Sequence, residues 1–133
     1  MADSPPRNRV LVIDDDAAVR QTFRRLIEDA GFDVVVAGDG AEGLQMLRDD
    51  PTIGLVLLDY DMPGLNGAGV RAVQRADPRL WSVPTVMVSG TQQSEGLRDE
   101  LQPTEYLRKP VSRKRLLATV ARYCAPRPAS DDS

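Results

Sequence analysis

The most informative segment of this chain reads Leu55-Val56-Leu57-Leu58-Asp59-Tyr60-Asp61-Met62-Pro63-Gly64-Leu65-Asn66-Gly67. Its leading apolar run is typical of a short strand buried on both faces, as in a parallel sheet. The proline, glycines and asparagine that follow Asp61 indicate turns, so we expect the strand to end at Asp59. Open α/β sheets bind ligands beyond the carboxyl ends of their strands. Asp59 is therefore a candidate site residue, and a helix N-cap or a turn aspartate is the alternative interpretation.

The composition indicates a single soluble domain and argues against contact with nucleic acid or membranes. The length of 133 residues fits one domain, and 41% apolar and 28% charged residues are ordinary for a soluble globular protein. A net charge of -3 without a basic block argues against direct binding of nucleic acid. We see no signal peptide and no apolar run approaching the roughly 18 residues of a membrane span. With Cys124 as the only cysteine, these features predict a cytoplasmic protein without membrane contact.

The sequence contains no histidine. This excludes nucleophilic sites of the Ser-His-Asp or Cys-His type and any metal site with histidine ligands. A phosphohistidine, where the chemistry requires one, has to come from another protein.

Short apolar runs alternate with amphipathic segments along the chain. We predict strands at 10–13, 34–37, 55–58, 84–88 and 105–108, and helices at 17–30, from 41 to near 50, at 68–76 and from 112 onward. The residues expected to face the sheet are Val19, Phe23, Leu26, Ile27, Ala30, Ala41, Leu44, Leu47, Val70, Val73, Leu116, Leu117, Val120 and Ala121. Asp16 is the predicted N-cap and Gly31 the predicted C′ residue of the first helix. The repeated βα pattern predicts a doubly wound α/β fold, a five-stranded parallel sheet with helices on both faces.

The domain boundaries follow from composition. We expect a flexible leader at 1–9, one folded domain at 10–125 and a disordered tail rich in Pro, Ser and Asp at 126–133. The segment 91–103 is polar and contains Gly96 and Pro103, which leaves only 97–101 for a helix of one or two turns. Such a short helix has little apolar surface to dock, so we expect it to be more mobile than the others.

Charged or hydroxyl-bearing residues follow four of the five predicted strands. Asp14-Asp15 follow the first strand, Asp59 the third, Ser89 the fourth and Lys109 the fifth. With strand order 2-1-3-4-5 these positions share one edge of the sheet. Crowded carboxylates raise one another's pKa unless a cation binds, and hard oxygen ligands without His or Cys suit Mg²⁺. A carboxylate can attack phosphorus to form an acyl phosphate, with Mg²⁺, Lys109 and a Ser89 hydroxyl to stabilise the oxygens. Taken singly, the same residues also fit a capping cluster, a turn serine and a surface lysine.

From Val10 to Pro110 the sequence resembles the receiver domain of bacterial two-component response regulators, in the single-domain, chemotaxis-regulator-like form. The matching residues are Asp14-Asp15, Asp59 with Met62-Pro63-Gly64 and Asn66-Gly67, Ser89, Tyr106 and Lys109-Pro110. The resemblance implies a flavodoxin-like fold. It also implies that Asp59 accepts a phosphoryl group from a histidine kinase or a histidine phosphotransfer protein, and that the phosphorylated form binds a downstream protein target.

The resemblance implies a role for each matching residue. Mg²⁺ would be held by Asp14, Asp15, Asp59 and the backbone carbonyl of Asp61. Ser89 and Tyr106 would be the switch pair, and Lys109, after a cis Lys109-Pro110 peptide, would contact the phosphoryl oxygens. Such a domain catalyses its own phosphoryl transfer and hydrolysis and is not an enzyme for an outside substrate. By the same resemblance, phosphorylation or partner binding is expected to order 92–102.

Three positions depart from the usual family pattern. Ser89 replaces the commoner threonine and keeps the hydroxyl. The segment Gln102-Pro103-Thr104 stands where the family usually has a turn with glycine. Asp61 adds a carboxylate whose side chain we expect beside Asp59, where its charge would favour a cation and repel an anionic phosphodonor.

Two alternatives remain at this point. A phosphatase of the haloacid-dehalogenase type also places Asp-x-Asp after a strand, and Asp59-Tyr60-Asp61 fits that spacing. The following Met62-Pro63 does not fit that motif, and no cap insertion is visible. The other alternative is a receiver-like module that binds partners without being phosphorylated.

Overall fold

The computed structural model describes residues 7–62, 64, 66–90 and 104–127. Its strands are β1 (Arg9–Ile13), β2 (Asp33–Ala37), β3 (Ile53–Asp59), β4 (Thr85–Ser89) and β5 (Glu105–Arg108). Its helices in the described ranges are α1 (Ala17–Asp29), α2 (Gly40–Asp49), α3 (Gly67–Ala76) and α6 (Arg113–Tyr123). All neighbouring strands are parallel in the order β2-β1-β3-β4-β5, which confirms the predicted doubly wound topology. The short helix predicted at 97–101 lies outside the described residues.

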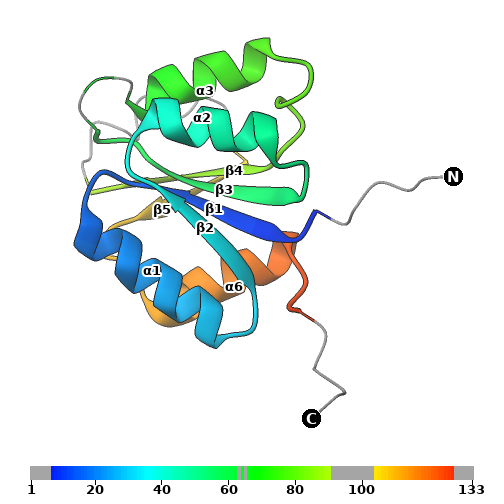
Figure 1. The fold of residues 1–133 in the computed structure, drawn as a ribbon. Helices are drawn as coiled ribbons and strands as arrows, with labels where there is room; N and C mark the ends of the chain where they lie inside the picture. The colour runs from blue at the N-terminus through cyan, green and yellow to red at the C-terminus, as the bar shows by residue number, and fades with distance from the viewer. Residues whose placement is uncertain (1–6, 63, 65, 91–103, 128–133) are drawn as a thin grey trace, which may run out of the picture.

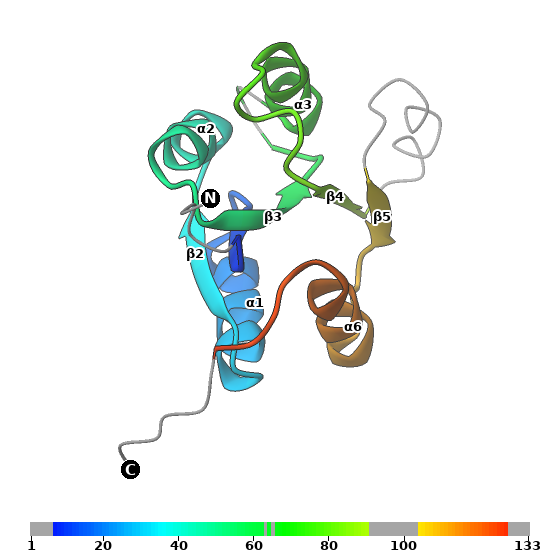
Figure 2. The same cartoon turned by 90° about the vertical axis from the view of Figure 1, so that its right-hand side faces the viewer.

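The sheet separates two helical layers. Helices α2 and α3 cover one face, and α1 and α6 cover the other (Figures 1 and 2). Successive side chains of a strand point to opposite faces. In β1, Val10 and Val12 therefore join the core beneath α1 and α6, while Leu11 and Ile13 join the core beneath α2 and α3. Every residue of β3 is buried, which explains its continuous apolar run.

Capping side chains fix where the helices begin. Asp16 accepts hydrogen bonds from the backbone N–H groups of Ala18 and Val19, which confirms it as the N-cap of α1. Gly31 follows the end of that helix with φ +94, the left-handed conformation expected of a C′ glycine. Asn66 and Ser112 cap α3 and α6 in the same way as Asp16. Polar residues between the apolar runs thus fix the residue at which each of these three helices begins.

Two alanines predicted to face the sheet are exposed instead, Ala41 in α2 and Ala121 in α6. In α2 the buried position belongs to Gly43, where a Cβ atom would lie 2.3 Å from Cδ1 of Ile13. The helix packs closely on β1 there, and a side chain at this position would displace the side chain of Ile13. In α6 the buried position belongs to Thr119, whose hydroxyl is satisfied by a helix carbonyl one turn earlier.

Hydrogen bonds join residues on the two sides of each predicted domain limit. Arg9 is the first residue of β1, one position earlier than predicted. The backbone N–H of Ala125 donates to Oδ1 of Asn8 at 3.2 Å, and the backbone N–H of Arg127 donates to the carbonyl of Gly31 at 2.7 Å. These hydrogen bonds link Asn8 and Arg127, assigned from the sequence to the leader and the tail, to residues of the predicted domain. Residues 1–6 and 128–133 lie outside the described part.

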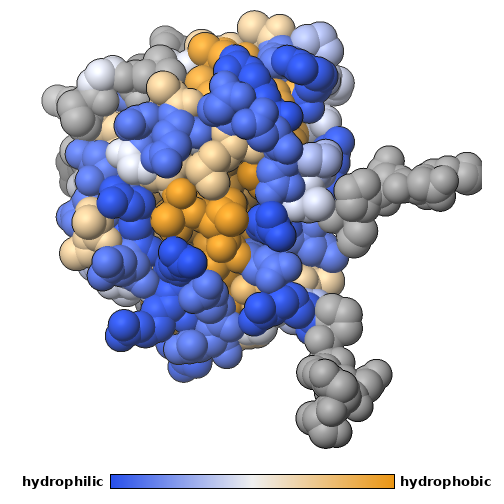
Figure 3. All heavy atoms as spheres, in the orientation of Figure 1, coloured by the Kyte–Doolittle hydropathy of each residue, from blue (hydrophilic) through white to orange (hydrophobic). Residues whose placement is uncertain are grey.

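Most of the molecular face seen in Figure 3 is hydrophilic. On the face seen in Figure 3, an apolar area lies between α1 and α2, over the sheet edge formed by β2, and hydrophilic residues surround it. Val35 and Val36 of β2 are half-buried because no further strand pairs with this edge in the described part of the chain. Among the described helices, none has the length and apolar character needed to cross a bilayer.

Candidate functional site

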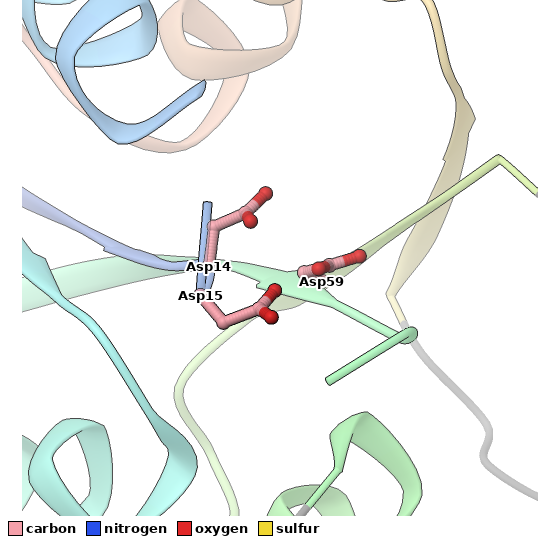
Figure 4. Close-up of side chains that lie close together, drawn as sticks. All are labelled: Asp14, Asp15 and Asp59. Atoms are coloured by element: carbon pink, nitrogen blue, oxygen red, sulfur yellow. The ribbon is translucent and has the colours of Figure 1, made fainter. Parts of the chain in front are cut away.

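Four of the candidate side chains lie at the carboxyl edge of the sheet. Asp14 follows β1, Asp59 is the last residue of β3, Ser89 ends β4 and Lys109 follows β5. The carboxyl ends of β1 and β3 are adjacent because these strands are neighbours at the topological switch point. Figure 4 shows the side chains of Asp14, Asp15 and Asp59 extending from these strand ends to the same side. The positions predicted from strand order are therefore brought together.

The three aspartates form a candidate metal centre. One carboxylate oxygen from each of Asp14, Asp15 and Asp59 lies within 4.8 Å of the others. Asp14 and Asp59 are only 2% and 3% exposed, whereas Asp15 is exposed. Carboxylate oxygens without nitrogen or sulfur donors are the ligand set that Mg²⁺ prefers, and the open side at Asp15 leaves room for the waters that this ion retains. The donor set and its exposure fit Mg²⁺.

Lys109 brings a positive charge to the same site. Its Nζ lies 3.2 Å from Oδ2 of Asp14 and 3.4 Å from Oδ1 of Asp59. Its backbone N–H donates to the carbonyl of Ser89 at 2.9 Å, so the β4–β5 ladder holds the main chain at this point. The Lys109-Pro110 peptide is cis, as the family resemblance implied.

The electrostatics of the site centre on Asp59. Burial and the neighbouring Asp14 carboxylate raise the pKa of Asp59 to about 6, while the Lys109 ammonium and the N–H of Asp61 oppose the rise. Burial also disfavours the charge on Lys109, but the carboxylates of Asp59 and Asp14 outweigh it and raise the pKa of the ammonium. Lys109 is therefore protonated at neutral pH. A single ammonium facing two buried carboxylates leaves negative charge that a divalent cation would neutralise.

A sequence profile of the response regulator receiver domain matches residues 10–121. The chain belongs to the response regulator receiver family. It is 38% identical over 117 residues to the DNA-binding response regulator MtrA of Mycobacterium tuberculosis strain H37Rv, an alignment that covers 86% of this chain and 49% of MtrA. It is 34% identical over 115 residues to the transcriptional regulatory protein CpxR of Escherichia coli K12, covering 85% of this chain and 47% of CpxR. The receiver chain thus spans about half the length of these curated relatives.

Solved receiver structures share the fold over nearly their whole length. A response regulator receiver protein from Pseudomonas putida superposes with a TM-score of 0.81 at 30% identity, covering 89% of this chain and 98% of that one. The chemotaxis response regulator CheY4 of Vibrio cholerae superposes with a TM-score of 0.78 at 26% identity, covering 86% of this chain and 97% of that one. Family membership argues against the haloacid-dehalogenase interpretation of Asp59-Tyr60-Asp61, which had rested on spacing alone.

In this receiver domain Asp61 contacts two of the other site residues. Its backbone N–H donates to Oδ1 of Asp59 at 3.2 Å. Its Oδ2 accepts a hydrogen bond from the hydroxyl of Ser89, also at 3.2 Å. Its carboxylate is not part of the converging group formed by Asp14, Asp15 and Asp59. The sequence led us to expect this side chain along the rim beside Asp59, and it lies there at the end of β4, the neighbour of β3. Its effect on cation binding remains a prediction.

Tyr106 and Ser89, the predicted switch pair, lie on adjacent strands. In the register of β4 and β5, Tyr106 is opposite Met87 and Ser89 is opposite Arg108. The Tyr106 side chain is half-buried against the core beneath α2 and α3, and its hydroxyl oxygen is buried. Ser89 is fully buried. The switch role of the pair remains a prediction.

Three supports of the site were missed from the sequence. Nη1 of Arg20 donates to the main-chain carbonyl of Asp14 at 2.8 Å, and the N–H of Asp16 donates to Oδ1 of Asp14 at 2.9 Å. A Cβ atom on Gly67 would lie 2.8 Å from the carbonyl oxygen of Asp59, so only glycine fits beneath this loop. The sequence had indicated Gly67 as a turn residue and as part of the family match, without this close approach to Asp59. Arg20 stands four residues after Asp16, the predicted N-cap, which places it one helical turn from Asp14-Asp15-Asp16. This spacing could have indicated a basic side chain near these aspartates.

Proposed function

We propose that this receiver domain takes a phosphoryl group from a phosphohistidine protein onto Asp59 and, in that form, changes the partners it binds. The observation that supports this most directly is the position of the Asp59 carboxylate. It is buried at the end of β3, with Asp14 and Asp15 on one side and the Lys109 ammonium 3.4 Å away. A nucleophile, a cation site and a fixed positive charge therefore share one small space.

The transfer step follows from this arrangement. An oxygen of Asp59 forms a bond to phosphorus while the bond from phosphorus to the donor's imidazole nitrogen breaks, and the imidazole takes up a proton as it leaves. The pKa of Asp59, about 6, lies below 7, so the carboxylate is mainly ionised at pH 7, and the ionised form is the nucleophile. Lys109 stabilises the negative oxygens of the transferring group.

The side chains of Asp14, Asp15 and Asp59, with the main-chain carbonyl of Asp61, would hold Mg²⁺. When bound, the ion neutralises the carboxylates and the phosphoryl oxygens as charge shifts between them. Hydrolysis by water then returns Asp59 to the free carboxylate, so we propose self-phosphotransfer and autodephosphorylation without turnover of an outside substrate.

The partners follow from the chemistry. Since the sequence has no histidine, the donor is a separate histidine kinase or histidine phosphotransfer protein. We propose a protein target downstream and no contact with nucleic acid by this stretch itself, whose net charge is -3. The single cysteine, Cys124, is buried and suits the reducing cytoplasm in which we propose that the domain works.

Labelling with small phosphodonors tests the proposal. Phosphoramidate carries a phosphorus–nitrogen bond like that of phosphohistidine, and acetyl phosphate serves as a second donor. With Mg²⁺, intact mass should show one phosphoryl group on the wild type and on the surface control Asp29→Asn, and none on Asp59→Asn. Rapid repeated turnover of donor without a labelled protein would instead indicate a phosphatase. No labelling and no turnover would indicate a passive binding module.

A further inference from the structure

We infer that Asp61 is a positioning residue that holds the Ser89 hydroxyl in the unphosphorylated protein and thereby opposes the phosphorylated state. This inference rests on the proposed function. It concerns the carboxylate of Asp61, which the family resemblance did not assign a role. Its backbone carbonyl, by contrast, is expected at the metal site.

Asp61 lies between the acceptor and the hydroxyl. Its backbone N–H contacts Oδ1 of Asp59, and its Oδ2 accepts from Oγ of Ser89, each at 3.2 Å. A serine hydroxyl has one proton and therefore donates to one acceptor at a time. A charged acceptor makes this hydrogen bond stronger than a neutral one would. In the unphosphorylated protein, the Ser89 hydroxyl donates to Oδ2 of Asp61.

A phosphoryl group on Asp59 would offer a competing acceptor. Its oxygens are charged and would stand at the end of β3, beside the end of β4 where Ser89 lies. For Ser89 to donate to them, its hydrogen bond to Asp61 must break. Asp61 itself is exposed, so water can take the place of the hydroxyl at its carboxylate at little cost. The Asp61–Ser89 hydrogen bond is therefore a reversible restraint, which suits a switch.

Two properties of Asp61 can be separated by substitution. Asp61→Asn removes the charge and keeps a carbonyl acceptor for Ser89, whereas Asp61→Ala removes both. If Asp61 acts by holding the hydroxyl, Asp61→Asn should resemble the wild type more closely than Asp61→Ala does. If Asp61 acts only through its charge, the two variants should behave alike. Because the side chain is exposed, both variants should keep the fold.

The restraint can be observed without metal or phosphodonor. In Mg²⁺-free buffer, the NMR three-bond couplings of Ser89 report the population of its χ1 rotamers. We expect the same dominant rotamer in the wild type and in Asp61→Asn, and a changed rotamer distribution in Asp61→Ala. Identical couplings in the wild type and Asp61→Ala would overturn the inference.

A double-mutant cycle measures the consequence. Beryllofluoride, which mimics a phosphoryl group on a carboxylate, is titrated with saturating Mg²⁺ into the wild type, Asp61→Ala, Ser89→Ala and the double variant. A hydrogen bond of ordinary strength predicts that Asp61→Ala binds beryllofluoride roughly 3- to 10-fold more tightly than the wild type. In the Ser89→Ala background the same substitution should have no effect.

The outcomes distinguish this inference from the function on which it rests. An equal gain in both backgrounds would show that Asp61 acts through its charge and not through Ser89, and the inference would be wrong. Tight binding by the wild type without any gain in Asp61→Ala would refute it as well. Absence of beryllofluoride binding in all four proteins would refute the proposed function, and the inference with it.

Discussion

The Nζ atom of Lys109 lies 3.4 Å from Oδ1 of Asp59, although β4 separates the strands that carry them. The two residues meet because β3 and β5 are parallel and end at the same edge of the sheet. Lys109 also contacts Asp14, so one ammonium compensates two buried carboxylates. The excess negative charge that remains determines how the metal-free protein should respond to substitution and to pH.

Lys109→Met should destabilise the metal-free protein at pH 7. The substitution keeps an apolar stem of similar length and removes the charge that faces Asp59 and Asp14. Because the lysine side chain is 28% exposed, we expect a loss of only about 1–2 kcal/mol in the free energy of unfolding. Urea unfolding followed by circular dichroism measures it, with Lys114→Met on the exposed surface of α6 as the matched control. Equal stability of the two variants would contradict this view of Lys109.

Asp59→Asn should stabilise the metal-free protein at neutral pH. The pKa of Asp59 rises from 3.8 to about 6 on folding, so the native state holds this proton more tightly than the unfolded state does. The contribution of Asp59 to stability is therefore fully present below pH 3.8 and is lost as pH rises through 6. A shift of this size corresponds to a difference on the order of 3 kcal/mol at pH 7.

Urea midpoints of the wild type and Asp59→Asn between pH 3.5 and 7.5 test the sign. The advantage of the variant should grow across the interval from about pH 4 to pH 6 and then level off. Saturating Mg²⁺ should reduce it, since the cation stabilises the charged carboxylate. An advantage that did not change with pH would mean that Asp59 titrates normally.

Asp15→Asn should weaken Mg²⁺ binding at least roughly tenfold, because it removes one of three hard ligands. Asp15 is exposed, so the same change should leave the stability of the metal-free protein equal to or slightly above that of the wild type. Isothermal titration with Mg²⁺ measures the affinity. The neighbouring Asp16→Asn is the control, because asparagine is an equally good N-cap for α1. A parallel loss of affinity in Asp16→Asn would indicate a general charge effect and no specific ligand.

Gln74→Leu should destabilise the domain without changing phosphorylation at Asp59. The Gln74 side chain is 1% exposed and donates to the carbonyls of Leu80 and Val83, so it holds the loop between α3 and β4. Its replacement leaves two buried carbonyls without this donor, at a cost of about 2–4 kcal/mol. Urea unfolding and acetyl phosphate labelling of the folded variant provide the two readouts. The exposed Gln45→Leu is the control, and equal stability of both variants would refute the role of Gln74.

The sequence alone was sufficient for the architecture. Short apolar runs between amphipathic segments predicted five parallel strands with helices on both faces, because burial of those runs is the dominant favourable term in folding. The same pattern placed Asp14, Asp59, Ser89 and Lys109 at one edge, since strand direction fixes which end of each strand they occupy. The sequence also predicted Asp16 correctly as the N-cap of α1, because capping depends on residues that are close together in the chain.

Only the tertiary structure decided the contacts between those elements. That Asp61 accepts from Ser89 and that Arg20 reaches the carbonyl of Asp14 depends on loop conformation and helix phase. Neither is encoded in a run of neighbouring residues. The exposure of Ala41 is a similar case. Helix α2 contacts β1 through Gly43 rather than through Ala41, and the apolar periodicity of the sequence does not show how closely the helix and the strand approach. The sequence thus determined which groups reach the site, and packing determined how they are paired there.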